Sequence, residues 1–312
     1  MNIRAGTAYN AGTNIYYEVL GRPAHETLIL ISGLGSQLVY WTDELCQVFV
    51  DRNFQVVRFD NRDVGLSSKT SGPAQPVSEI LRSKEVDAPY SLSDMAEDTI
   101  GILDALEIET AHMMGVSLGG MIAQTLAIEF PQRVRSLVSI MSAPRPRMAI
   151  SDDELSAEAV RKSLTVDLNN PETYVDLQVE GYRATSGPHF DETYIRQILQ
   201  RSFNRCYHPA GWSVQMAAAR ASGERISGLS RLTLPSLIIH GAADPLIPVS
   251  SGQATAAAIP NARLMIIEDM GHCLLAPHWA LVADAVAELA RYARHSPLST
   301  TCLLYTSPSP RD

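Results

Sequence analysis

"MMGVSLGGM", residues 113–121, is the stretch that decides the expected fold. It places Ser117 between glycines, directly after an apolar run and directly before residues with helical spacing. Glycine costs about 1 kcal/mol relative to alanine inside a helix, so glycines at this place need a structural reason. A tight strand-to-helix turn supplies one, because a serine on it needs small neighbours two positions away, where Gly115 and Gly119 stand. An ordinary strand–helix turn is the alternative interpretation of so short a pattern.

Short apolar runs alternate with amphipathic helical stretches on both sides of this turn. Runs that are apolar throughout and rich in branched residues are typical of strands in a parallel sheet covered by helices on both faces. The alternation therefore predicts a doubly wound α/β domain. Strands are expected at residues 14–21, 28–33, 55–60, 111–117, 134–142, 236–244 and 262–269. The main helices are expected at residues 91–109, 121–130 and 277–296.

The alternation stops between residues 146 and 230, where helical patterns follow one another without a strand pattern. The proline-containing stretches "APRP" and "RLTLP" flank this region. We expect a helical cap at 146–230, inserted between the two parts of an α/β core at 1–145 and 231–301. Four cap helices are predicted, at residues 152–166, 171–186, 191–203 and 212–222.

Charge and composition narrow the class of protein. The net charge is −9, with 25 Lys and Arg against 34 Asp and Glu, and no basic cluster is visible. Nucleic-acid binders need clustered Lys and Arg, so a nucleic-acid partner is not expected. The N-terminus has no apolar signal region, and no apolar run has the length of a membrane span, so no membrane partner is expected either.

The four cysteines and eight histidines form no motif with metal-ligand spacing. The sequence contains no CxxC pair and no HExxH stretch. Scattered thiols of this kind are typical of a reducing compartment. A cytoplasmic protein without a metal site is therefore expected.

A serine needs a base, and two residues further along the chain are candidates. Asp244 in "HGAADPLIP" (240–248) and His272 in "EDMGHCLL" (268–275) each follow an expected strand. The carboxyl ends of parallel strands meet at one edge of the sheet, where α/β sites assemble. Taken singly, Asp244 is also typical of a turn before proline, and His272 of a loop. The chain order Ser117, Asp244, His272 is the one that α/β-hydrolases use, and it predicts a catalytic triad.

An acyl-transfer site also needs backbone donors for an oxyanion. "ISGLGSQ" (31–37) follows an early expected strand, and its glycines let the backbone approach a substrate. The amides of Leu34 and Leu118 are the predicted donors. A plain glycine turn is the alternative for this loop.

Together these motifs resemble the α/β-hydrolases of the esterase-like kind with a helical cap, over residues 10–296. "RFDNRDVGLSS" (58–68) is similar to the Asp-x-Arg-x-x-Gly-x-Ser stretch of that family. The resemblance implies a mostly parallel sheet with helices on both faces. It also implies that Asp60, Arg62 and Ser67 brace loops rather than react.

The stretches "SGLGSQ" and "QMAAARASGERI" are similar to the branch with aclacinomycin methylesterase-like and 3-oxoadipate enol-lactonase-like enzymes. One departure stands out. Ser32-Gly33 takes the place of the His-Gly pair found at the oxyanion strand end of many relatives. The backbone donor is unaffected by this exchange.

The sequence thus predicts a carboxylic ester hydrolase that needs no cofactor and acts on small to medium, mostly apolar substrates. An enol-lactonase, a carbon–carbon bond hydrolase and a cofactor-free haloperoxidase-like perhydrolase would share the triad. A hydrolase-derived receptor or binding module is the alternative from another class. Haloalkane dehalogenases and epoxide hydrolases fit less well, because they carry Asp at the nucleophile position. The expected pocket-lining side chains of the cap are Tyr182, Phe203, Trp212 and Met216.

The last eleven residues, "CLLYTSPSPRD" (302–312), resemble the in-frame translation of a transposon-type sequencing adapter. We expect them to be an artefact of sequence assembly, with a disordered tail as the alternative. Deletion of 302–312 should then leave ester turnover and melting temperature unchanged, because the segment was never selected to pack. Both can be measured on the two purified chains. A melting temperature several degrees lower after deletion would contradict the assignment.

Overall fold

The central element is an eight-stranded sheet, seen in a computed structural model that describes residues 3–71, 75–83, 85–146 and 170–295. The strand order is β1-β2-β4-β3-β5-β6-β7-β8. The β1–β2 and β2–β4 pairs are antiparallel, and every pair from β4 to β8 is parallel. The predicted mostly parallel α/β sheet is confirmed. The strands are β1 (Arg4–Asn10), β2 (Thr13–Leu20), β3 (Glu26–Ile31), β4 (Phe54–Phe59), β5 (Ala111–Val116), β6 (Val134–Ile140), β7 (Ser236–Gly241) and β8 (Arg263–Ile267).

Strand β1 is an addition to the seven predicted strands. It pairs with β2 through a two-residue turn at Ala11 and Gly12, both with positive φ (44° and 87°). That geometry belongs to hairpin turns, whose usual sequence signal is Asn-Gly rather than Ala-Gly. Most of β1 is exposed or half-buried, and it carries few apolar side chains, so its hydrophobic pattern was too weak to predict a strand.

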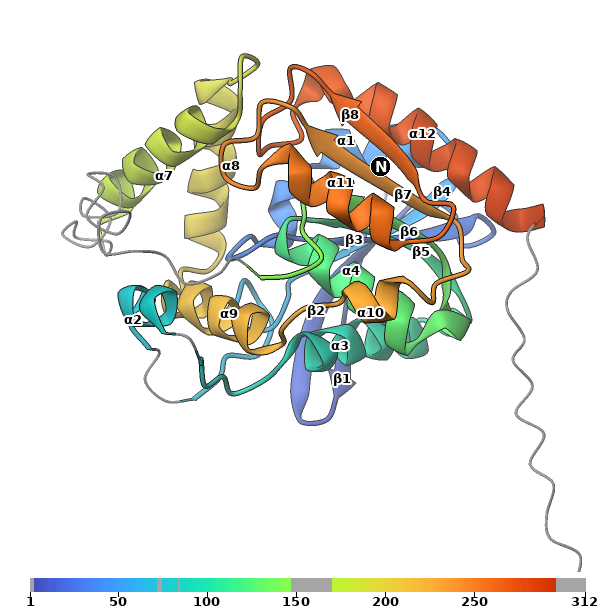
Figure 1. Cartoon of the computed structure of the whole chain (residues 1–312). Coiled ribbons are helices and arrows are strands. Elements are labelled where there is room, and N and C mark those ends of the chain that lie inside the picture. Colours follow the sequence, from blue (N-terminus) through green and yellow to red (C-terminus); the bar gives the residue numbers. More distant parts are fainter. Residues whose placement is uncertain (1–2, 72–74, 84, 147–169, 296–312) are drawn as a thin grey trace, which may run out of the picture.

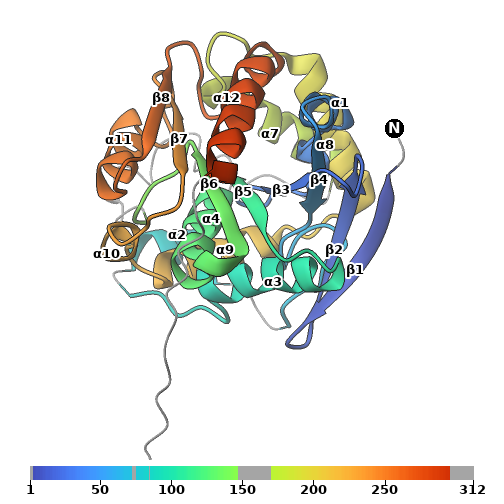
Figure 2. The same cartoon turned by 90° about the vertical axis from the view of Figure 1, so that its right-hand side faces the viewer.

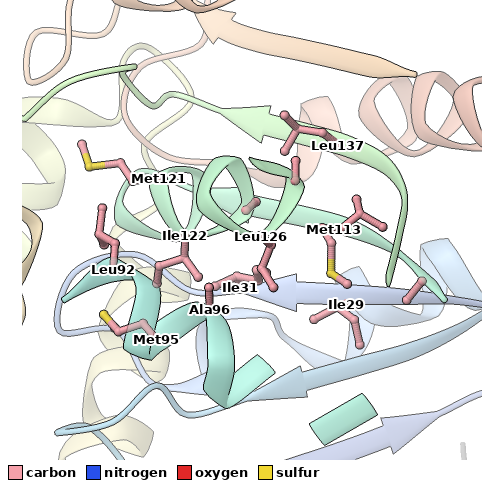
Figure 3. Close-up of a cluster of buried hydrophobic side chains, with 14 of the residues drawn as sticks. Ile29, Ile31, Leu92, Met95, Ala96, Met113, Met121, Ile122, Leu126 and Leu137 are labelled. Carbon is pink, nitrogen blue, oxygen red and sulfur yellow. The ribbon is translucent and has the colours of Figure 1, made fainter. Parts of the chain in front are cut away.

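Helices cover both faces of the sheet, as expected (Figures 1 and 2). Helices α3, α4 and α11 lie on one face, and α1 and α12 lie on the other. Figure 3 shows the first face, where Ile29, Ile31 and Met113 of the sheet meet Ile122 and Leu126 of α4. The covering helices are α1 (Asp43–Val50), α3 (Leu92–Ala105), α4 (Leu118–Glu129), α11 (Val249–Ala258) and α12 (Ala276–His295).

Local signals explain where two of these helices begin. Ser91 and Asp94 form a reciprocal capping box at the start of α3, in which each side chain accepts from the other residue's backbone N–H. Thr42 caps α1 in the simpler way, with its hydroxyl accepting from Leu45 N.

The described part of the predicted cap is helical and contains no strand. Helices α7 and α8 form a pair beyond one end of the sheet, and α9 packs against α2 (Figure 1). Helix α10, at the end of the predicted cap, packs instead against α4 and α11 of the core. The expected helix at 152–166 and the tail at 302–312 fall outside the described residues. The remaining elements are α2 (Val77–Arg82), α7 (Pro171–Thr185), α8 (Glu192–Arg205), α9 (Ala210–Ala221), α10 (Ile226–Leu229) and the short 3₁₀ turns Leu38–Tyr40 and Pro131–Arg133.

None of the helices in the described ranges is both long enough and apolar enough to cross a membrane.

Ile122 tests the packing between α4 and the sheet, because its side chain is fully buried. Ile122→Ala should lower the free energy of unfolding by about 2–5 kcal/mol, through lost burial and a residual cavity. Leu264→Ala on β8 is the matched control, since Leu264 is 41% exposed and should cost at most about 0.5 kcal/mol. Urea unfolding of both variants measures the difference. Equal losses would contradict the described packing.

Candidate active site

Ser117 lies on the tight turn that the sequence predicts. It joins the end of β5 to the start of α4 with φ 53° and ψ −117°, a conformation that L-residues rarely adopt. A methyl group on Gly115 would overlap the carbonyl oxygen of Gly119, and one on Gly119 would overlap that of Ile31. Both glycines are therefore required by close backbone approach, and the turn presents the Ser117 side chain above the sheet edge.

Hydrogen bonds with the end of β6 and with a residue just after it hold this turn in place. Ser117 N–H donates to Ile140 O at 2.9 Å, which continues the pairing of β5 with β6. The hydroxyl of Ser142 donates to Ser117 O at 2.7 Å. The strained residue is thus fixed from both sides of its peptide unit.

Asp244 and His272 meet Ser117 at the same edge of the sheet. His272 Nε2 lies 3.1 Å from Ser117 Oγ, and His272 Nδ1 lies 2.7 Å from Asp244 Oδ2. Asp244 follows β7, and His272 follows β8. The three residues that the sequence singled out therefore form one continuous hydrogen-bonded chain.

The Asp244 carboxylate fixes which nitrogen of His272 carries hydrogen. Its Oδ1 accepts from the backbone N–H groups of Leu246 and Ile247, both at 2.9 Å, and its side chain is fully buried. An ionised carboxylate only accepts, so Nδ1 of His272 donates to Oδ2. Nε2 then offers its lone pair to the Ser117 hydroxyl, the arrangement that a general base needs.

A second histidine, His240, lies beside the Asp244 carboxylate, with Nε2 3.6 Å from Oδ2. This nitrogen also lies 2.9 Å from Ile247 O, to which it can donate. Burial lowers the pKa of His240, which keeps it neutral at ordinary pH. His272 is therefore the base candidate, because it is the histidine in contact with both Asp244 and Ser117.

The two predicted oxyanion donors belong to segments next to Ser117. Leu118 is the first residue of α4, so its N–H has no acceptor within the helix. Leu34 lines the same cavity as Ser117. A Cβ built on Gly33 would lie 3.5 Å from Ser117 Cβ, so the Gly33–Leu34 loop passes directly beside the serine.

The loop that carries Leu34 is held by a residue that sequence analysis did not identify. Gln215 of α9 is fully buried, accepts from Gly35 N–H at 2.9 Å and donates to Arg62 O at 2.8 Å. It lies within the quoted stretch "QMAAARASGERI", where a glutamine among alanines was the available signal. Ser32, the departure from the family pattern, lines the cavity, and within the described ranges its Oγ has no hydrogen-bond partner.

Ser117 and His272 open into a cavity of about 420 Å³. Tyr182 and Trp212 line it, as expected, whereas Phe203 lines a neighbouring cavity of about 400 Å³. Met216 lines neither. The sequence predicts that these side chains lie on cap helices, but it does not predict which face of each helix points toward the site. The apolar wall of the first cavity includes Leu34, Trp41, Met141, Ile195, Ile198 and Leu274.

Residues that the sequence did not single out also line this cavity. One of them is Tyr40, which stacks on the predicted Tyr182 with ring centroids 6.1 Å apart, and burial raises the pKa of both hydroxyls. Burial likewise raises the pKa of the Cys273 thiol to about 12. These groups therefore stay protonated at neutral pH and leave the cavity uncharged around Ser117.

The expected bracing role of Asp60 and Ser67 is confirmed. Asp60 Oδ1 accepts from Leu38 N and Oδ2 from Leu66 N, both at 2.8 Å. Arg205 of α8 forms a 2.7 Å ion pair with Oδ2. Ser67 Oγ donates to Asp60 O at 2.6 Å. Asp60 thus ties two core loops to a cap helix.

Arg62 is structural as well. Its Nε and Nη2 donate to the Asp98 carboxylate at 2.6 and 2.8 Å, and its guanidinium lies 4.8 Å from the ring centre of Tyr90. Asp98 lies on α3, so this bidentate pair anchors the Arg62 loop to a helix of the core.

One cluster among the described residues has the donor atoms for a metal ion, formed by His189, Asp269 and His278. None of the three lines the cavity around Ser117.

The chain belongs to the α/β-hydrolase family, whose fold it matches over residues 26–278. It is 28% identical over 299 residues to rhodomycin D methylesterase DnrP of Streptomyces peucetius, covering 89% of this chain and 95% of that protein. It is 26% identical over 262 residues to 3-oxoadipate enol-lactonase 2 of Acinetobacter baylyi, covering 84% and 88%.

A solved structure with the same fold is a thermophilic esterase from Thermogutta terrifontis, with a TM-score of 0.69 and 19% identity. The match covers 93% of this chain and 99% of that one. The predicted resemblance to the α/β-hydrolases is confirmed. The predicted resemblance to methylesterase-like and enol-lactonase-like enzymes is confirmed by the two relatives named above. This chain is accordingly an α/β-fold hydrolase with esterase-like relatives.

Proposed function

We propose that this hydrolase cleaves carboxylic esters, with Ser117 as nucleophile, His272 as general base and Asp244 as the residue that orients the base. The observation that carries the proposal is the hydrogen-bonded chain Ser117–His272–Asp244 at the floor of an uncharged cavity. The methylesterase relative supports ester chemistry in general.

In the first half of the reaction, Ser117 Oγ attacks the ester carbonyl carbon while His272 Nε2 removes its proton. The tetrahedral intermediate then collapses, the C–O bond to the alcohol breaks, and His272 returns the proton to the departing oxygen. The acyl group is left on Ser117. In the second half, water gives a proton to His272 Nε2 and attacks the acyl carbon. The bond to Ser117 Oγ then breaks, His272 returns the proton to that oxygen, and the acid is released.

Charge stabilisation is assigned to three groups. The N–H groups of Leu34 and Leu118 hold the oxyanion, each contributing about 3 kcal/mol to transition-state stabilisation. Asp244 stabilises the imidazolium that forms when His272 takes a proton. The two backbone amides belong to rigid elements, a helix start and a loop held by Gln215.

The lining of the first cavity supports small to medium, uncharged acyl groups. Its walls are aliphatic and aromatic, and the Tyr40 and Tyr182 hydroxyls and the Cys273 thiol are kept neutral by burial. Each methylene buried there contributes about 0.8 kcal/mol until the space is full.

A second candidate, a bulkier acid as its methyl ester, is favoured by the neighbouring cavity. Its aromatic wall includes Tyr174, Phe203 and Trp212, and it shares Leu34 and Tyr182 with the first cavity. Methyl esters of fused-ring aromatic acids would use both spaces. Faster turnover of such an ester than of any simple acyl ester would favour this candidate. An enol-lactonase, a carbon–carbon bond hydrolase and a perhydrolase would use the same three residues. Faster turnover of an enol-lactone, of a substrate with a cleavable carbon–carbon bond, or of peroxide with an acyl donor would identify each of these activities.

Ser117→Ala should lower kcat for p-nitrophenyl butyrate on the order of 10⁶-fold, because no other group supplies the attacking oxygen. His272→Ala should be similarly damaging. Asp244→Asn should be milder, about 10⁴-fold, because Asp244 acts only through the imidazole. Circular dichroism and melting temperature show whether each variant is folded. A folded Ser117→Ala or His272→Ala variant with near-normal turnover would overturn the assignment. If the protein is a receptor or binding module instead, the wild-type chain itself should turn over no activated ester.

The acyl preference is tested with p-nitrophenyl esters of increasing chain length. We expect kcat/KM to rise from acetate to about butyrate or hexanoate and then to fall, because the cavity fills. Initial rates across the series measure this profile. A value that still climbs at palmitate would indicate an open groove and contradict the enclosed apolar site.

A further inference from the structure

The loop that carries His272 is in close contact with the cap. His272 N–H donates to Thr185 O, the last residue of α7, at 2.6 Å. Gly187 follows in the cap and lies against Gly271, with a built Cβ on Gly187 only 3.1 Å from Gly271 N. The position of the base candidate is therefore coupled to the segment that links α7 to α8.

Three side chains gather beside this contact, each from a different segment. His189 comes from the α7–α8 connection, Asp269 from the β8–α12 loop and His278 from the first turn of α12. His189 Nε2 lies 2.5 Å from Asp269 Oδ2, and His278 Nε2 lies 3.2 Å from Asp269 Oδ1. All three candidate ligand atoms lie within 4.8 Å of one another.

The chemistry of this set matches a borderline divalent cation. Two imidazole nitrogens and one carboxylate oxygen are ligands that Zn²⁺ and its first-row neighbours accept, at about 2.0–2.2 Å. Ligand atoms around a tetrahedral centre with such bonds lie roughly 3.3 Å apart, so small side-chain rotations would bring these three to bonding distance. Calcium and magnesium prefer oxygen ligands and fit less well.

The surroundings give the cluster one buried and one open side. The His278 side chain is only 5% exposed, whereas those of His189 and Asp269 are 34% and 53% exposed. A cation could enter from solvent, be held by His278 from within, and keep water in its fourth position. The ring centroids of His189 and His278 lie 5.2 Å apart, and the rings are nearly perpendicular. Each ring contacts a different oxygen of the Asp269 carboxylate.

We propose that His189, Asp269 and His278 form a binding site for a divalent transition cation of the Zn²⁺ type, which clamps the cap to the loop that carries His272. The cation would bridge His189 of the cap connection to Asp269 and His278 of the core. It takes no part in the ester chemistry, so this inference is independent of the proposed function. The sequence did not predict the site, because its ligands are separated by 80 and 9 positions and meet only in the fold.

Zinc titration of the full chain, stripped with EDTA, tests the binding site. Isothermal calorimetry with ZnCl₂ should show a binding event that is lost or weakened at least tenfold in His189→Gln and in Asp269→Asn. His25→Gln, in the turn before β3, is the matched control and should bind like wild type. Saturating Zn²⁺ should raise the melting temperature by about 5 °C in wild type and the control but not in the two cluster variants.

Several outcomes would overturn the proposal. Absence of binding up to 1 mM Zn²⁺ (a concentration of order 10³ times a micromolar Kd) would mean that the cluster is only a hydrogen-bonded contact. Binding that survives both cluster variants would place the cation elsewhere, for example on a cysteine. The clamp has its own readout, since Zn²⁺ should slow amide hydrogen exchange in residues 185–190 and 268–272 of wild type. Zinc binding without slower exchange there would refute the clamp.

Discussion

The site depends on one strained residue. Ser117, with its positive φ, lies where α4 begins so close to β5 and to the end of β3 that only glycine fits at 115 and 119. The backbone strain is offset by the hydrogen bonds that Ser117 N–H donates to Ile140 O and that Ser117 O accepts from Ser142, and by the buried helix that follows. Once this turn is fixed, the positions of the serine hydroxyl and of the first amide of α4 relative to the cavity are fixed as well. The proposed chemistry needs the hydroxyl and the amide in that relation.

The cap acts on the site through polar contacts as well as by covering it. Gln215 of α9 holds Gly35, next to the proposed oxyanion donor, and Thr185 of α7 holds the backbone of His272. Arg205 of α8 reaches the buried Asp60. A displacement of the cap would therefore disturb both the base and the oxyanion loop. A cation bound by His189, Asp269 and His278 would restrain one of these contacts, the one between the cap and the loop that carries His272.

The sequence predicted most of the sheet, the covering helices α3, α4 and α12, and the meeting of Ser117, Asp244 and His272, because these depend on local patterns and on parallel strand ends sharing one edge. It did not predict the covering helices α1 and α11. It missed β1, whose small and polar residues carry no clear alternation. It placed Phe203 in the pocket around Ser117, whereas the structure places this side chain only in the neighbouring cavity, which Tyr182 and Trp212 also line. Helix rotation and the packing between distant loops determine such details, and neither leaves a periodic signal. The same reason explains why the sequence led us to expect no metal site, although three histidine and aspartate side chains from distant segments meet in the fold.

Covalent labelling can identify the nucleophile by its position in the chain. Diethyl p-nitrophenyl phosphate transfers its phosphoryl group to an activated serine and stops there, because the phosphoserine is hydrolysed slowly. We expect one p-nitrophenolate released per chain and one diethylphosphoryl adduct, located on Ser117 by peptide mass spectrometry, with labelling abolished in His272→Ala. An adduct on another residue, or complete resistance to labelling in a chain that hydrolyses p-nitrophenyl butyrate, would contradict it.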